Sequence, residues 1–149
     1  MKSALLFSSQ HGRTRKVVDV AMRELTVKPD RLDVKEAPSP ETLSSYDLLL
    51  FFCPTYGDEE LQQDMEDYLR QLALDLTGKR FAVCELGNYY GYDDFSFGAM
   101  RILRRRLLEL NGRELCQPLS LDSLPKVNWG QLSRWVAAVN LSLNHHAGR

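Results

Sequence analysis

Short apolar runs alternate along this chain with longer segments whose apolar residues recur at helical spacing. Residues 4–7, 48–53 and 81–84 are apolar throughout, which indicates strands with both faces buried. Two further candidate strands, around residues 32–34 and 114–119, are mixed in polarity, and the second contains a proline, which cannot donate a hydrogen bond to a neighbouring strand. The pattern therefore predicts a parallel sheet with three central strands and two edge strands.

Four segments carry apolar residues at the spacing of an amphipathic helix. They are residues 18–25, 61–76, 95–107 and 132–139. Residues 38–41 are typical of a turn that can open a short helix. We therefore expect a doubly wound five-stranded α/β fold with helices on both faces of the sheet. We expect it to form one domain over residues 1–149, with a frayed tail at residues 144–149.

Charge and length narrow the classes of function. The 149 residues suit a single domain. With 19 basic and 20 acidic residues, the formal net charge is −1, which favours neither nucleic acid nor a membrane surface as a partner. No run reaches the roughly 20 apolar residues that a membrane helix needs. A monomer is expected.

The cysteines indicate a reducing compartment. Cys53, Cys84 and Cys116 lie far apart in apolar segments and form no C-x-x-C pair, so we interpret them as core thiols. The apolar run near the N-terminus is too short for a signal peptide. These features predict a cytoplasmic protein.

The loop after the first expected strand is small and polar, and it leads directly into a helix. It comprises Ser8, Ser9, Gln10, His11, Gly12, Arg13 and Thr14. Amides and hydroxyls in such a loop can hold a phosphate at the positive end of the helix. The alternative is an ordinary turn capped by Ser9 or Thr14. Arg13, Arg15 and Lys16 favour the phosphate, because cations are unfavourable at a helix N-terminus unless an anion lies nearby, although they could also be simply solvated.

Two further loops follow central strands, and parallel sheets bind ligands at these strand ends. The loop after residues 48–53 contains Pro54, Thr55, Tyr56, Gly57 and Asp58. The loop after residues 81–84 places three tyrosines and two glycines in residues 87–92. Exposed aromatic rings in a polar loop suggest a planar ligand, although at least one tyrosine is expected to pack against the neighbouring helix. The candidate contacts here are Leu86, Gly87, Asn88, Tyr89, Tyr92 and Phe95.

The three loops resemble the FMN-binding loops of flavodoxins, in the same order. The first is similar to the phosphate motif S-x-T-G-x-T: Ser9, Gly12 and Thr14 match it, whereas His11 and Arg13 replace the usual threonine and asparagine. Residues 54–58 are close to P-T-[WY]-G-[DE]. Residues 87–92 are similar to G-D-x-x-G-Y, with asparagine at the aspartate position.

This resemblance implies a flavodoxin-like strand order of 2-1-3-4-5 and non-covalently bound FMN. Tyr92 is expected to stack on one face of the flavin ring, and Tyr56 to cover the other. The chain is similar to the short-chain type, because no room follows Gly112 for a large loop that splits the fifth strand. The acidic residues between 58 and 67, together with Asp93 and Asp94, are expected near the ring, where they would lower its potential. The four arginines between residues 101 and 106 are expected on a solvated helix face.

The family implies a carrier of single electrons between a reductase and acceptor enzymes, with no catalytic or metal-ligating residue of its own. The main alternative is an FMN-dependent NAD(P)H or quinone oxidoreductase of the same fold. A phosphorylated signalling receiver would need acids where residues 8–9 and 54–55 carry Ser-Ser and Pro-Thr. A module that has lost its flavin stays open, because His11 and Arg13 depart from the phosphate motif.

Overall fold

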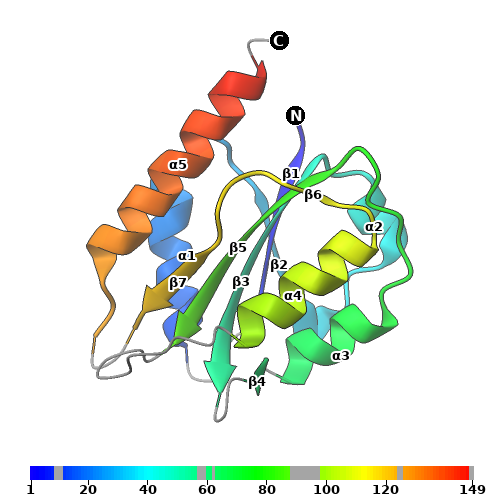
Figure 1. Ribbon diagram of the computed structural model, residues 1–149, viewed down its shortest axis with the longest axis horizontal. Helices are drawn as coiled ribbons and strands as arrows, with labels where there is room; N and C mark the ends of the chain where they lie inside the picture. The colour runs from blue at the N-terminus through cyan, green and yellow to red at the C-terminus, as the bar shows by residue number, and fades with distance from the viewer. Residues whose placement is uncertain (9–11, 57–59, 62, 88–97, 124–125, 148–149) are drawn as a thin grey trace.

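A mostly parallel sheet forms the middle of the protein (Figure 1). The computed structural model describes all residues except 9–11, 57–59, 62, 88–97, 124–125 and 148–149. The strands in the described residues are β1 (Ser3–Phe7), β2 (Asp30–Asp33), β3 (Leu48–Tyr56), β4 (Glu60–Leu61), β5 (Arg80–Gly87), β6 (Arg113–Glu114) and β7 (Leu119–Asp122). They pair in the order β2-β1-β3-β5-β6, with β7 also on β5 and β4 on β3. All pairs are parallel except β3 with β4. The predicted order 2-1-3-4-5 is therefore confirmed.

Helices cover both faces of this sheet, as predicted. They are α1 (Arg13–Glu24), the 3-10 turn η1 (Val34–Glu36), α2 (Pro40–Ser44), α3 (Gln63–Gln71), α4 (Gly98–Glu109) and α5 (Trp129–Ala147). In Figure 1, α3 and α4 lie in front of the sheet and α1 lies behind it. Among the described residues, no helix is long and apolar enough to cross a membrane.

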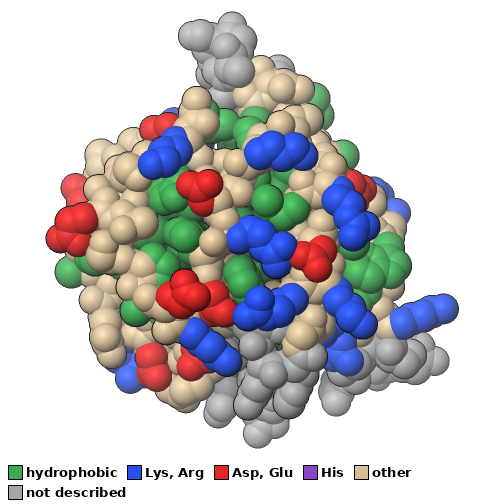
Figure 2. Space-filling view, turned by 180° about the vertical axis from the view of Figure 1, so that it is seen from behind, with side chains coloured by type: hydrophobic (Ala, Val, Ile, Leu, Met, Phe, Trp, Pro, Cys, Tyr) green, Lys and Arg blue, Asp and Glu red, His purple; other side chains and the backbone are tan. Residues whose placement is uncertain are grey.

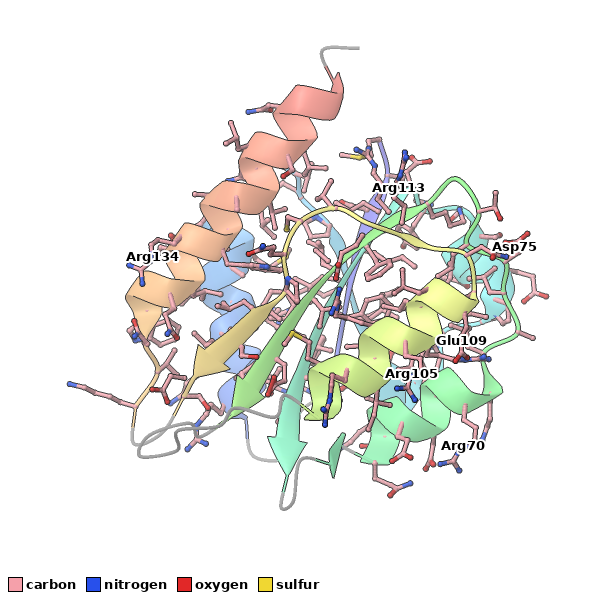
Figure 3. All side chains as sticks on the ribbon, viewed as in Figure 1. Arg70, Asp75, Arg105, Glu109, Arg113 and Arg134 are labelled. Atoms are coloured by element: carbon pink, nitrogen blue, oxygen red, sulfur yellow. The ribbon has the colours of Figure 1, made fainter. Side chains whose placement is uncertain are left out.

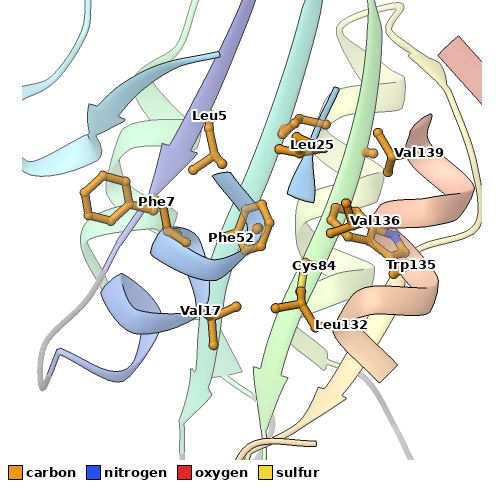
Figure 4. Packing of buried hydrophobic residues seen from close by; sticks show 14 of the residues in the cluster. Leu5, Phe7, Val17, Leu25, Phe52, Cys84, Leu132, Trp135, Val136 and Val139 are labelled. Carbon is orange, nitrogen blue, oxygen red and sulfur yellow. The ribbon is translucent and has the colours of Figure 1, made fainter. Parts of the chain in front are cut away.

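Two apolar clusters fill the space between the sheet and its helices. The cluster under α3 and α4 includes Phe51 and Phe81 from the central strands. The cluster under α1 and α5 includes Phe52 and Trp135, whose rings meet edge to face with centroids 5.5 Å apart (Figure 4). Alternate residues of each central strand enter opposite clusters, which explains why the strands are apolar without interruption.

The predicted fifth strand is wrong in one respect, because it is split into β6 and β7 by residues 115–118. Pro118 lies in the break and has no N–H to offer β5. The carbonyl of Gln117 instead accepts a hydrogen bond from Trp135 Nε1 at 3.1 Å. The break is only a few residues long, so it differs from the large insertion that the resemblance argued against.

Two helix ends also differ from the prediction. The helix expected over residues 61–76 ends at Gln71, where Arg106 donates to the carbonyls of Leu69 and Leu72, both at 2.9 Å. The tail expected to fray from residue 144 continues the backbone of α5 to Ala147.

The arginines of α4 are less solvated than predicted. Arg106 serves α3 through these backbone contacts, and Arg104 makes a two-pronged ion pair with Glu114 at 2.7 and 2.8 Å. Arg105 is exposed, as expected, and projects from α4 in Figure 3. The helix therefore uses half-buried guanidinium groups to hold its neighbours.

Candidate functional site

The ends of four strands meet at one edge of the sheet. Strand pairing aligns Phe7 with Phe52, Pro54 with Leu86, and Gly87 with Asp122. The three predicted loops therefore leave the sheet at the same edge, together with the segment that joins β7 to α5. The chain leads from β1 to β2 on one side, while β3 lies on the other, so the strand order reverses here. A ligand is expected at such a reversal.

Ser8 opens the first loop and carries an unsatisfied hydroxyl. Its backbone N–H donates to the carbonyl of Phe52 at 3.2 Å, and the residue is fully buried. The Oγ atom has no hydrogen-bond partner in the described part of the chain. Because a buried polar atom without a partner is unfavourable by roughly 1–3 kcal/mol, Ser8 is a candidate contact for a polar ligand.

Gly12 begins α1 in a left-handed conformation, with φ 81°. Among the described residues, no side chain caps this helix, and no acidic residue lies in its first turn. Thr14, a predicted cap, lies inside the helix and is buried, so that alternative is wrong for Thr14. Ser9, Gln10 and His11 lie outside the described residues. The positive end of α1, with no acid in its first turn, is a place that favours an anionic group.

The three cations at this helix differ in their surroundings. Arg15 pairs with Asp33 at 3.0 Å, and its guanidinium lies 5.2 Å from the centre of the Phe7 ring. Arg13 and Lys16 are exposed. Figure 2 shows basic and acidic side chains interspersed on this side of the molecule, seen from behind. Arg15 is thus held by β2, and Arg13 stays the candidate for a phosphate contact.

The second predicted loop begins inside the sheet. Pro54, Thr55 and Tyr56 belong to β3, which is longer than predicted, and Thr55 and Tyr56 pair with β4. Gly57, Asp58 and the side chain of Tyr56 lie outside the described residues. The antiparallel pairing anchors both ends of this loop at the candidate edge.

The third predicted loop leaves from the end of β5. Leu86 and Gly87 are buried there, and the carbonyl of Gly87 accepts two hydrogen bonds from Ser123, from N–H and Oγ, both at 2.9 Å. Asn88, Tyr89, Tyr92 and Phe95 lie outside the described residues. Ser123 thus ties the start of this loop to the segment after β7.

That segment contains residues that the sequence analysis missed. Asp122 Oδ1 is buried and has no partner among the described residues, whereas the Asp122 N–H donates to Gln131 Oε1 at 3.0 Å. The Asp122 carbonyl accepts from the Asn128 N–H at 2.8 Å. The sequence offered one signal for such site residues, namely polar residues directly after the last apolar residue of an edge strand. Asp122 is a second unsatisfied oxygen at the candidate edge.

The cysteines do not supply reactive thiols. Burial, and secondarily the charge of Glu85, raise the pKa of Cys53 well above its usual value, and burial also raises the pKa of Cys84. Cys116 lies between β6 and β7, where burial raises its pKa to about 11. No group of metal-binding side chains occurs in the described residues. The prediction of core thiols is confirmed for Cys53 and Cys84, while Cys116 is half-buried.

Fold and edge together define an α/β protein whose loops meet at a topological switch point, where a ligand is expected. The family model described as Flavodoxin matches residues 5–128. A flavodoxin from Synechocystis sp. is 30% identical over 115 residues, which cover 75% of this chain and 67% of the relative. A flavodoxin from Nitratidesulfovibrio vulgaris is 26% identical over 148 residues, which cover 93% of this chain and 97% of the relative. The chain therefore belongs to the flavodoxin family.

Solved structures share its fold. Oxidised Flavodoxin 1 from Bacillus cereus superposes with a TM-score of 0.76 at 23% identity, covering 93% of this chain and 97% of that one. A Fusobacterium nucleatum flavodoxin bound to flavin mononucleotide gives 0.73 at 18% identity, covering 99% and 98%. The chain therefore shares the fold of these structures over most of its length.

Proposed function

We propose that this protein binds one FMN at the carboxyl edge of its sheet and carries single electrons between a reductase and acceptor proteins. The observation that carries the proposal is the coincidence of family and site. The flavodoxin model spans residues 5–128, and it includes the strand ends where the structure leaves buried polar atoms unsatisfied.

The residues at the start of α1 fit the phosphate of FMN. A phosphate would accept hydrogen bonds from backbone N–H groups near Gly12 and from the Ser8 hydroxyl, and it would favour the positive end of the helix. The exposed Arg13 would add a cation nearby. Ser9, Gln10, His11 and Thr14 complete the proposed phosphate loop.

The other two loops would hold the flavin ring. We assign Tyr56 and Tyr92 to its two faces, with Pro54, Thr55, Gly57, Asp58, Leu86, Gly87, Asn88, Tyr89 and Phe95 around it. Each stacked ring contributes roughly 0.5–1.5 kcal/mol beyond the area it buries. FMN supplies the redox chemistry, and the protein binds it, orients it and limits its contact with water. A reducing, cytoplasmic setting agrees with the free cysteines.

Titration of the purified apoprotein with FMN and riboflavin tests the proposal. We expect one FMN per chain, quenched flavin fluorescence, and tighter binding of FMN than of riboflavin, because riboflavin lacks the phosphate. Tyr92→Ala should weaken binding more than Tyr89→Ala. A protein that quenches neither flavin at micromolar concentration would disprove the assignment.

A carrier and an enzyme are separated by a second assay. We expect no turnover when the FMN-loaded protein is mixed with NADPH and a quinone, and turnover once a flavodoxin reductase is added. Steady consumption of NADPH without the reductase would instead identify an oxidoreductase of the same fold.

A further inference from the structure

Glu85 is a buried acid in the middle of the protein. Among the Asp and Glu residues in the described part of the chain, it is the one classed as buried, with no exposed surface. A carboxylate removed from water is strongly unfavourable unless its surroundings compensate. Its place among the buried residues 81–87 of β5 therefore calls for a function.

The surroundings of Glu85 come from two neighbouring strands and one helix. Strand pairing places Cys53 of β3 and Ser120 of β7 on either side. Ser120 Oγ donates to Glu85 Oε2 at 3.1 Å and lies 4.0 Å from the sulfur of Met100 in α4. The pKa of Cys53 is raised partly by the charge of Glu85, which agrees with this proximity. Ser120 thus orients the carboxyl group.

Glu85 also lies beside the proposed flavin site. It precedes Leu86 and Gly87, the last residues of β5, so the third loop starts two residues further along the strand. At about 3.3 Å per residue, this places its backbone within roughly 7 Å of the start of that loop. Asp122, which pairs with Gly87, lies as close, but that residue is partly exposed whereas Glu85 is fully buried.

We propose that Glu85 is a redox-tuning residue, whose carboxyl group, when ionised, lowers the reduction potential of the bound FMN. This inference rests on the proposed function. Reduction adds negative charge to the flavin, and a like charge nearby opposes it. Because Glu85 is shielded from solvent, salt should screen its effect far less than that of an exposed acid.

Redox titration of FMN-loaded Glu85→Gln tests this inference. Glutamine keeps the shape and can still accept the hydrogen bond from Ser120, but it carries no charge. We expect reduction to become about tenfold more favourable, equivalent to about 59 mV for a one-electron step. The difference from the wild type should persist from low salt to 0.5 M salt.

Glu66→Gln is the matched control. Glu66 lies on α3, is partly exposed and pairs with Arg70 at 3.1 Å. Its removal should shift the potential less, and salt should abolish the shift. Ser120→Ala should move the potential less than Glu85→Gln does and should add nothing in a Glu85→Gln background, because Ser120 acts through Glu85.

The outcomes separate this inference from the proposed function. If wild type and Glu85→Gln bind FMN with the same potential, Glu85 has no tuning role, although FMN binding stands. A lower unfolding free energy of the apoprotein with an unchanged potential would likewise show a purely structural role. If Glu85→Gln does not fold, Glu85→Met gives the same test, because apolar replacement of a buried charge is often tolerated. Failure of the wild type to bind FMN would refute both.

Discussion

The N-termini of α1 and α2 are built in opposite ways. In α2, Ser39 accepts a hydrogen bond from the Thr42 N–H at 3.1 Å, Pro40 occupies the first turn, and Glu41 places a negative charge there. All three features stabilise a helix start. In α1, the residue before the helix is Gly12, no described side chain caps the helix, and no acid lies in its first turn.

The difference shows what each helix start is for. The N-terminus of α2 is satisfied by its own residues, so it needs nothing further. The N-terminus of α1 begins with Arg13, and the loop that leads to it starts at Ser8, whose buried hydroxyl has no partner among the described residues. The start of α1 lacks these stabilising contacts at the point where the proposed phosphate would supply them. Substitutions that treat the two helix starts alike should therefore have different results.

The largest effect is expected from Gly12→Val. Gly12 has φ 81°, and no described atom lies within 4 Å of an added Cβ atom, so the main effect of the substitution on the apoprotein is backbone strain. With FMN the added side chain should displace the phosphate from the loop amides. We expect the FMN dissociation constant to rise about hundredfold, or about 2.7 kcal/mol, as measured by fluorescence titration.

Gly78→Val is the control, because Gly78 has φ 82°, equally open space, and a place in the turn before the amino end of β5. Both variants should lose about 1–2 kcal/mol of unfolding free energy from a left-handed residue. FMN affinity should be unchanged in Gly78→Val. Equal losses of affinity in the two variants would show that backbone strain, and not a phosphate site, explains the result.

A smaller and reciprocal effect is expected from two serines. Ser39→Ala should lower the unfolding free energy by about 1 kcal/mol, because it removes the cap of α2, and should leave FMN affinity unchanged. Ser8→Ala should leave apoprotein stability unchanged or slightly higher, since it removes an unsatisfied hydroxyl. Its FMN affinity should fall about tenfold, the low end for a hydrogen bond to a charged group. Urea unfolding and FMN titration measure both, and a destabilised Ser8→Ala apoprotein would contradict this account of α1.

The sequence predicted which strands and helices form better than it predicted where each of them ends. Uninterrupted apolar strands such as residues 48–53 have to lie in the centre of a parallel sheet, and this periodicity was enough to find the fold. Ser39-Pro40 also indicated the short helix α2 correctly. Local composition decides such features, so they can be read one segment at a time.

Contacts between segments far apart in the sequence could not be predicted in this way. The end of α3 depends on Arg106, 34 residues from Leu72. The break in the fifth strand depends on Trp135 as well as on Pro118. In the sequence, Glu85 simply follows the apolar residues 81–84. Its burial beside Ser120 becomes visible only when β5 and β7 pair. A periodic pattern shows which face is apolar, but it does not show which distant side chain satisfies a carbonyl or a carboxylate.

The smallest effect should separate the two arginines at the start of α1. Both arginines are exposed, but Arg15 is paired with Asp33 of β2 and lies over the Phe7 ring. Arg13→Gln should therefore weaken FMN binding by about twofold to fivefold, as an exposed charge contributes roughly 0.3–1 kcal/mol, and salt should remove the effect. Arg15→Gln should change FMN affinity less and instead slightly destabilise the contact between α1 and β2. Titrations at low and high salt measure the contrast, and a larger, salt-sensitive loss in Arg15→Gln would assign the phosphate to Arg15.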